Sequence, residues 1–441
     1  MDSDDAAGSR PKKLARYDHP NWAMLDCYLR PLRDGDTTTA LAYASTGSGG
    51  KIGVGLVAAA PPRTSYLLYQ WIPDEGRRCG GSSHKPTMIH RSWDAKAVAA
   101  HGNSILLHFL FPMNNGTFPG KSEEFFVYQA LPRRTRRLTK LPTCRQNHTF
   151  MNRDTKMNTG ILRRESGEFV VAHLTVLPGG RGDHRVTAEL CCFFGNKGSW
   201  RRTECVPIIC CDEAEQKHLG WWKTDVVLSF GDFICWVDYF RGILLCDVFS
   251  HHPVVKYVPL PVTPYHGNCN PHLRIRGAPA TYRSVSVTNR GGGIKFVDIA
   301  PGDAWFCGGH GVARLPSHIS SWTLTEEQLW VEDGVVSIKE VFGRAGLPSS
   351  PLECPLVDMI DPDTIYFVLG DDVQDDEQEE QELRDPYSQS CLIAVHMKSR
   401  TVDMISCDIR SFGSSDMYRN TTSCNLYFHE PFISLNLDVS H

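Results

Sequence analysis

The 441-residue sequence lacks an apolar run long enough to cross a membrane and a hydrophobic leader at its N-terminus. The longest apolar candidate, residues 105–111, includes His108 and falls far short of the roughly 18 residues that a membrane helix needs. Residues 1–20 are polar and lack the core of a secretory signal, so we expect a disordered tail there. These absences predict a protein of the cytoplasm or nucleus that is neither secreted nor held in a membrane.

The sequence also has little excess charge of either sign. It contains 46 basic and 50 acidic residues, for a formal net charge of -4. Such a balance provides no broad positive field, so nucleic acid is not an expected partner. A hydrophobic fraction of 41% and a charged fraction of 22% are typical of a folded protein. The exception is the acidic segment 371–385, which we expect to be a mobile loop.

Signatures of catalysis and phosphate binding are missing. The glycine-rich stretch 47–51 fails as a phosphate-binding loop, because Ser45 stands where the first glycine is needed and Ile52 follows the lysine. No Gly-x-Ser-x-Gly turn occurs. The doublets at 191–192 and 210–211 lie in or beside apolar strands, where buried thiols are unreactive. The sequence therefore predicts no catalytic residues and no cofactor.

A metal site is not predicted either. No Cys-x-x-Cys pair occurs, although His266, Cys269 and His272 lie close together and Cys307 precedes His310 by three residues. Zinc usually takes four ligands in paired short spacings. We therefore interpret both stretches as polar loops without a metal ion.

What the sequence does contain is a series of short β-branched and aromatic runs separated by Gly, Pro, Asn and Asp, a pattern typical of strands. The predicted strands are 104–111, 124–129, 169–176, 187–194, 226–229, 233–238, 243–248, 254–258, 284–288, 294–299, 364–369, 392–396 and 401–406. Extended helical periodicity is almost absent. The fold class expected is all-β.

The strands group into units of about four, at 98–141, 160–207, 224–261, 282–338 and 356–409. A spacing of about 40–50 residues with four strands per unit is typical of a β-propeller. Residues 22–71 and the last strand, within 426–436, would close the ring. The prediction is one unit over 21–441, a degenerate propeller of about six blades. The alternative is two packed β-sandwich domains.

One part of the sequence resembles a known family. The stretches that carry the resemblance are 222–227, 234–238, 241–248, 257–261, 285–289, 294–298, 321–324 and 355–359. They resemble plant proteins, greatly expanded in grasses, that contain the domain of unknown function 1618 (DUF1618). The resemblance is strongest over 221–359. It implies a plant protein and no particular reaction.

The positions that match this family are Trp222, Asp225, Trp236, Asp238, Arg241, Gly242, Asp247, Pro259, Pro261, Asp298 and Trp322. We interpret them as structural. Aspartates at strand ends readily accept backbone N–H groups in tight turns, and tryptophans, including Trp221, are expected to pack between blades. The alternative is a functional polar rim on one face of the disc.

The basic run 133–140 is interpreted as a solvated loop between strands that could meet phosphate or an acidic partner. Without a catalytic signature, the function we expect is that of a non-enzymatic scaffold whose loops bind an unknown protein partner. The alternative is an enzyme or small-molecule binder with dispersed carboxylates or histidines in the axial channel. A deep polar pocket on the axis would favour that alternative, and an apolar plug would not.

Overall fold

The computed structural model describes fifteen stretches of the chain. They are residues 22–32, 40–47, 49–72, 95–115, 118–130, 136–143, 158–179, 185–210, 212–262, 279–288, 292–299, 317–347, 352–369, 391–405 and 432–436. Almost all regular structure in them is strand, as the sequence predicts.

The described strands form six blades, which are antiparallel except in blade 1, where β1 and β2 each pair in parallel with β5. Blade 1 contains β1 (Trp22–Asp26), β3 (Ala42–Ser45), β4 (Lys51–Val57), β5 (Thr64–Ile72) and β26 (Phe432–Asn436), with β2 (Arg30–Pro31) beside β5. Blade 2 contains β6 (Ala95–His101), β7 (Ser104–Asn115), β8 (Phe118–Gln129) and β9 (Arg137–Lys140). Blade 3 contains β10 (Thr159–Arg163), β11 (Phe169–Leu177), β12 (Thr187–Phe194) and β13 (Ser199–Ile209).

The second half of the chain repeats this plan. Blade 4 contains β14 (Val226–Phe230), β15 (Phe233–Asp238), β16 (Gly242–Cys246) and β17 (Val255–Pro259). Blade 5 contains β18 (Arg283–Thr288), β19 (Gly293–Asp298), β20 (His318–Leu324) and β21 (Trp330–Ser337). Blade 6 contains β22 (Leu352–Val357), β23 (Thr364–Leu369), β24 (Cys391–His396) and β25 (Thr401–Ile405).

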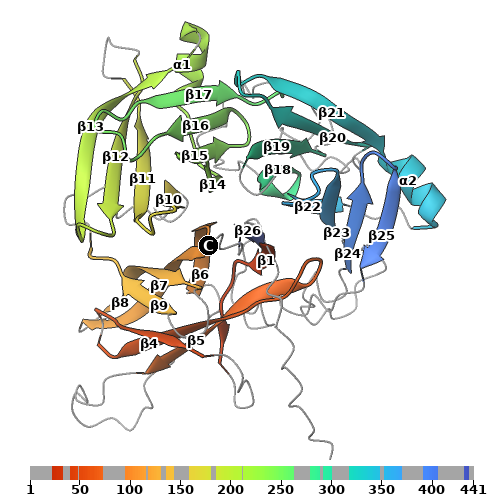
Figure 1. The fold of residues 1–441 in the computed structure, drawn as a ribbon. Coiled ribbons are helices and arrows are strands. Elements are labelled where there is room, and N and C mark those ends of the chain that lie inside the picture. Colours follow the sequence, from red (N-terminus) through yellow and green to blue (C-terminus); the bar gives the residue numbers. More distant parts are fainter. Residues whose placement is uncertain are drawn as a thin grey trace, which may run out of the picture.

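The blades lie around one central axis (Figure 1), and the strand nearest this axis is the first strand in chain order in blades 2–6 and β26 in blade 1. Blades 3 and 4 are also joined at their outer edge, because β13 pairs in parallel with β17. Six hydrophobic clusters fill the seams between neighbouring blades, including the seam between the last blade and the first. This arrangement is a six-bladed β-propeller, as predicted.

Strand alternation supplies the side chains for two seams at once. In β15, Ile234 and Trp236 enter the cluster between blades 3 and 4, whereas Cys235 and Val237 enter the cluster between blades 4 and 5. All four side chains are fully buried. Burial on both faces explains why this strand reads as a continuous apolar run in the sequence.

The ring closes where the two ends of the chain meet, and this prediction is confirmed. β1 pairs antiparallel with β26, from Trp22 opposite Asn436 to Asp26 opposite Phe432. The Met24 side chain of β1 packs with residues of blade 6 in one hydrophobic cluster. Closure by both chain ends removes two sheet edges that would otherwise be exposed.

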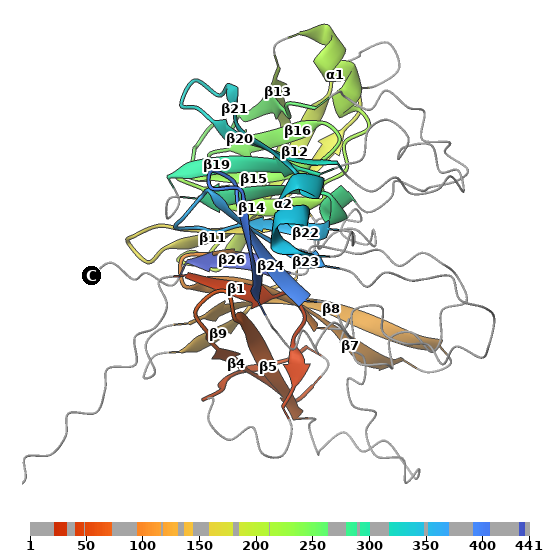
Figure 2. The same cartoon turned by 90° about the vertical axis from the view of Figure 1, so that its right-hand side faces the viewer.

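In the described stretches, three helical segments interrupt the strands: α1 (Glu213–Leu219), η5 (Pro279–Thr281) and α2 (Ile338–Ala345). α2 follows β21 and packs beside β25 at the rim of the ring (Figure 1). Turned by 90°, the view shows α2 in front of blade 6 and the long hairpin of β7 and β8 extending from blade 2 (Figure 2).

The two faces of the disc carry different connections. On one face the strands are joined by short turns, such as residues 102–103, 231–232 and 325–329; we call this the turn face. On the other face the connections are long, such as residues 210–225 and 260–282; we call this the loop face. One local prediction is wrong: the basic run 133–140 is not a loop throughout, because Arg137–Lys140 forms β9 and pairs with β8.

Candidate functional site

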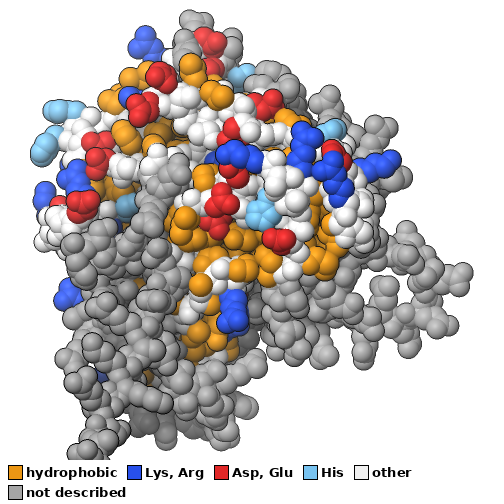
Figure 3. All heavy atoms as spheres, turned by 45° about the vertical axis from the view of Figure 1, so that its right-hand side comes forward, with side chains coloured by type: hydrophobic (Ala, Val, Ile, Leu, Met, Phe, Trp, Pro, Cys, Tyr) orange, Lys and Arg blue, Asp and Glu red, His pale blue; other side chains and the backbone are white. Residues whose placement is uncertain are grey.

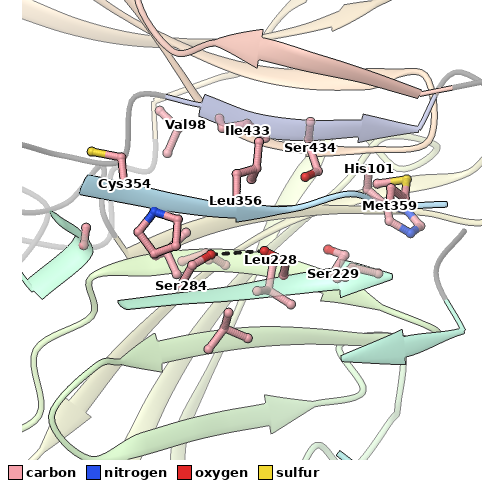
Figure 4. A pocket seen from close by; sticks show the side chains of 18 of the residues that line it. Val98, His101, Leu228, Ser229, Ser284, Cys354, Leu356, Met359, Ile433 and Ser434 are labelled. Atoms are coloured by element: carbon pink, nitrogen blue, oxygen red, sulfur yellow. Dashed lines mark hydrogen bonds between the residues drawn. The ribbon is translucent and has the colours of Figure 1, made fainter. Parts of the chain in front are cut away.

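The axis of the propeller holds a cavity of about 100 Å³. A water molecule occupies about 30 Å³, so the cavity is smaller than the roughly 300–1,000 Å³ of most ligand pockets. Val98 and Cys354 lie at one end and His101 and Met359 at the other, with Ser229 and Ser434 between (Figure 4). Among its described lining residues there is no carboxylate.

His101 is the imidazole of this cavity, and its chemistry is restricted. The backbone N–H of Arg163 donates to its Nδ1 at 3.0 Å. Burial lowers the pKa of His101 from its ordinary value. A neutral ring whose Nδ1 accepts a hydrogen bond carries its proton on Nε2 and has no free nitrogen to act as a base. The described part of the cavity therefore does not present the converging acids and histidines that an axial enzyme needs.

The buried cysteines are poor nucleophiles. Cys191 and Cys192 lie buried in β12. Burial raises the pKa of Cys192 to about 12 and that of Cys246, also buried, to about 12. A thiol with such a pKa supplies almost no thiolate at neutral pH. Cys210 is partly exposed, and its neighbour at 211 lies outside the described residues.

A hydroxyl, an imidazole and a carboxylate meet in blade 6. Thr364 Oγ1 lies 2.9 Å from His396 Nδ1, and His396 Nε2 lies 3.0 Å from Asp403 Oδ2. The order is that of a catalytic triad, but Thr364 donates its own proton to Asp361 Oδ2 at 2.6 Å. Thr364 is also only 5% exposed. The hydroxyl proton of Thr364 therefore points away from the imidazole, and a substrate could not reach this buried hydroxyl. We interpret the three side chains as stabilising local turns rather than as activating a nucleophile.

Asp238 and Arg241, two of the charged family positions, lie together at the loop face of blade 4. Asp238 is fully buried and binds Arg241 Nη1 through Oδ2 at 2.9 Å. The same carboxylate accepts the backbone N–H of Phe240 at 2.9 Å and that of Lys223 at 3.0 Å. Arg241 Nε in turn donates to the carbonyl of His218 at 2.9 Å. This buried ion pair therefore ties the β15–β16 turn to the connection that follows α1.

Three more aspartates of the family set also bind within the fold. Asp225 Oδ2 accepts the N–H of Tyr239 at 2.8 Å. Asp247 Oδ1 accepts the N–H of Phe249 at 3.0 Å. Asp298 accepts two hydrogen bonds of 3.2 Å from Arg283. These are the turn and ion-pair contacts that a structural interpretation expects.

Gly242 has a steric reason to be glycine. A Cβ at this position would lie 2.4 Å from the carbonyl oxygen of Val258 and 2.5 Å from the ring of Tyr257. The neighbouring strand approaches so closely that only glycine fits. Next along that strand, Pro259 is exposed and its carbonyl accepts the indole N–H of Trp330 at 2.8 Å, and Pro261 is partly buried.

Three tryptophans of the family set pack within the ring. Trp236 is fully buried and donates to the carbonyl of Asn158 at 2.8 Å. Trp222 lies edge-on to Tyr257 with ring centroids 6.4 Å apart. Trp322 lies 5.4 Å from the ring of Phe296 in the seam between blades 4 and 5.

Trp221 does not pack, and the expectation that it would is wrong. It is 70% exposed, the largest exposed fraction among the large hydrophobic residues that the structure describes. Its backbone N–H donates to the carbonyl of His218, the same carbonyl that Arg241 binds. The exposed indole thus projects from a connection that the buried Asp238–Arg241 pair holds in place. Adjacent tryptophans in the sequence gave no signal that one would pack against the ring and the other would be exposed.

Several predicted features lie outside the described residues: the tail 1–20, the acidic segment 371–385, and the His and Cys stretches 266–272 and 307–310. Within the described part of the chain, no three His, Cys, Asp or Glu side chains are grouped to hold a metal ion. No described helix is long and apolar enough to span a membrane.

The fold and these sites define a β-propeller with a narrow axial cavity. Residues 236–366 match the family model described as "Protein of unknown function (DUF1618)". The match runs from the middle of blade 4 through blade 5 into blade 6, and it overlaps the region where the resemblance is strongest. It supports the presence of this domain.

Similarity to solved structures is distant. The structure of YjhT is 10% identical, with a TM-score of 0.34, over 88% of this chain and 99% of that one. A protein from Lactobacillus plantarum is 11% identical, with a TM-score of 0.32, over 70% and 69%. Trypanosoma rangeli sialidase is 11% identical, with a TM-score of 0.28, over 80% and 56%. Such values say nothing about activity. No curated protein matches this chain.

Proposed function

We propose that this protein is a non-enzymatic scaffold that binds another protein through a surface centred on Trp221, in the cytoplasm or nucleus of a plant cell. The observation that supports the proposal is the 70% exposure of this indole on a fixed backbone. Tryptophan is enriched among the few interface residues that contribute most of a binding free energy. Singly exposed hydrophobic residues are common on protein surfaces, so the proposal depends on this residue being a tryptophan on a backbone that the fold holds in place.

Rigidity of the connection strengthens the proposal. Binding is weakened when a loop must be ordered on association, and a loop that is already fixed avoids this loss. The connection from His218 to Asp225 is held at both ends by the β15–β16 turn, because Arg241 Nε donates to the carbonyl of His218 and the backbone N–H of Tyr239 donates to the carboxylate of Asp225. Trp222 adds an anchor, since its indole N–H donates to Thr224 Oγ1 at 3.0 Å. The exposed indole is therefore preorganised for contact.

The surface charge is compatible with a protein partner rather than a nucleic acid. On the side that carries blades 5 and 6, acidic and basic side chains are interspersed among hydrophobic ones (Figure 3). A nucleic-acid surface needs a broad basic area. The axial cavity, at about 100 Å³ and without a described carboxylate, gives no observation that favours the enzymatic alternative.

The test is affinity purification of the tagged protein from cells of its source, followed by mass spectrometry. The variant Trp221→Ala is expected to lose a recurrent partner, with a loss in binding free energy of roughly 2 kcal/mol or more. The matched control is Leu329→Ala, because Leu329 is 64% exposed and belongs to the opposite, turn face. Absence of any recurrent partner, or equal loss in both variants, would contradict the proposal.

A further inference from the structure

A cleft of about 450 Å³ lies at the outer part of the seam between blades 2 and 3. Its polar wall comes from blade 2, where Gln129 of β8 pairs with Arg137 of β9 and Thr139 follows two residues later. Because side chains alternate along a strand, Arg137 and Thr139 share one face of β9, opposite to Leu138. Leu138 enters the cluster between blades 1 and 2, so the other two side chains face blade 3.

The opposite wall is apolar and comes from blade 3. Phe169 and Phe193 line the cleft, with their ring centroids 6.4 Å apart. The β12–β13 turn forms the rim beside them and contributes Gly195 and Gly198. A Cβ on Gly195 would lie 2.5 Å from the ring of Phe169, and Gly198 has a φ of +64°. Gly195 therefore requires glycine and the backbone at Gly198 favours it, which keeps this rim free of side chains.

The polar wall has unused hydrogen-bonding capacity. Gln129 is only 8% exposed, yet no residue in the described stretches hydrogen-bonds its side-chain amide. Arg137 is exposed, and no carboxylate among the described residues lies within ion-pair distance of it. Its neighbour Lys140 differs, because its ammonium binds Glu124 at 2.9 Å. The amide of Gln129 and the guanidinium of Arg137 are therefore both available to pair with a ligand in the cleft.

We infer that this cleft binds a short, extended peptide segment of a partner protein through a carboxylate or phosphate group. The guanidinium of Arg137 is a donor fork suited to such an oxyanion. The amide of Gln129 both donates and accepts, which matches a peptide group. Phe169 and Phe193 provide an apolar wall for the adjoining side chain. The volume falls within the roughly 300–1,000 Å³ of ligand pockets.

A nucleic acid fits this cleft less well than a peptide. The chain has a net charge of -4, and the cleft offers one exposed guanidinium without a described partner rather than a basic stripe. Arg136, the next basic residue, donates to the carbonyl of Ala40 instead. The observations therefore favour recognition of a single anionic group in a mixed polar and apolar setting.

Fluorescence anisotropy with the full chain tests the inference. The ligands are three labelled peptides of one length: alternating Leu and Glu, the same with Gln for every Glu, and the Gln peptide with one central phosphoserine. We expect the Gln peptide to bind about tenfold or more weakly than the better anionic peptide. If the Glu peptide binds more tightly the recognised group is a carboxylate, and if the phosphoserine peptide binds more tightly it is a phosphate. Equal binding of all three, or tighter binding of a labelled single-stranded oligonucleotide, would overturn the inference.

Variants locate the binding. Arg137→Gln is expected to weaken the anionic peptide about tenfold and to abolish its advantage over the Gln peptide. The matched control is Lys256→Gln, an exposed cation on β17 of blade 4, which should leave binding unchanged. Retained affinity in Arg137→Gln, with thermal unfolding like that of the unmodified chain, would overturn the inference. Trp221→Ala should not alter peptide binding, so failure here is distinguishable from failure of the Trp221 surface.

Discussion

The seam between blades 3 and 4 and the seam between blades 2 and 3 are built differently. At the first, β13 and β17 pair across the outer edge, and twenty buried hydrophobic residues of the described chain fill the space. At the second, no such pairing joins the described outer strands, and the cluster holds eight buried hydrophobic residues, three of which also line the cleft. The outer part of that second seam is the cleft beside Arg137.

The comparison shows how one repeated architecture supports two kinds of surface. Where strand pairing and packing seal a seam, a binding group can only project from a connection above it, as Trp221 does. Where the seam is left open at its outer edge, the blade faces themselves become walls of a site. Trp200 limits this opening, because its indole N–H reaches from blade 3 to the carbonyl of Pro142 at 2.8 Å.

A matched pair of leucine truncations tests this difference and should give the largest effects. Leu244 is fully buried in the sealed seam, and Leu141 is 3% exposed beside the cleft. Leucine-to-alanine changes in cores cost about 2–5 kcal/mol, depending on the cavity left behind. We expect Leu244→Ala to fall near the upper end and Leu141→Ala near the lower end, because water can enter the cleft. Denaturant unfolding of both variants measures the two free energies.

Equal losses for the two leucines would show that the seams are equally well packed. Their m-values should match that of the unmodified chain, since a changed m-value would point to an altered unfolded or native state.

A buried carboxyl group at the end of β1 in blade 1, that of Asp26, gives a smaller, pH-dependent effect than either leucine truncation. Burial raises the pKa of Asp26 from 3.8 to about 6, although the N–H of Tyr28 and the guanidinium of Arg30 donate to it. Because the folded chain then binds more protons than the unfolded chain between these pH values, stability falls as the pH rises from about 4 to 6. The decrease amounts to at most about 3 kcal/mol.

Asp26→Asn removes this titration. The unfolding free energy of the variant, minus that of the unmodified chain, should increase by up to about 3 kcal/mol between pH 4 and pH 6 and stay constant above. Denaturant unfolding at four or five pH values measures it. A difference that does not change with pH would show that Asp26 ionises normally in the folded chain.

The sequence predicted the blades well and the sites poorly. Strands such as Thr187–Phe194, Phe233–Asp238 and Thr364–Leu369 match their predicted bounds, because apolar runs between turn residues report burial on both faces directly. Closure of the ring followed from the spacing of the units. The strand Arg137–Lys140 was missed because four of the five residues before Leu138 are arginine, and local composition outweighed a pairing with β8 that is set by the fold.

The candidate sites depend on contacts between distant parts of the chain, which no local pattern encodes. The exposure of Trp221 follows from Arg241 holding the carbonyl of His218, a contact across 23 positions. The cleft depends on a turn of blade 3 lying opposite β9 of blade 2. A basic run and a Gly-x-x-Gly turn were visible in the sequence, but nothing in it placed Arg137 across from Gly195 and Gly198.

The smallest change in unfolding free energy is expected for Arg137→Gln, and it tests whether Arg137 serves binding or stability. Arg137→Gln removes a charge that has no ion-pair partner in the described chain, so the unfolding free energy should change by no more than about 0.5 kcal/mol. Lys256→Gln, on β17 at the seam between blades 3 and 4, should change the unfolding free energy as little. Thermal and denaturant unfolding of both variants, in parallel with peptide binding, gives the contrast. A loss of stability well above this value in Arg137→Gln alone would mean that the guanidinium stabilises the open seam, and the cleft would then be a structural gap rather than a binding site.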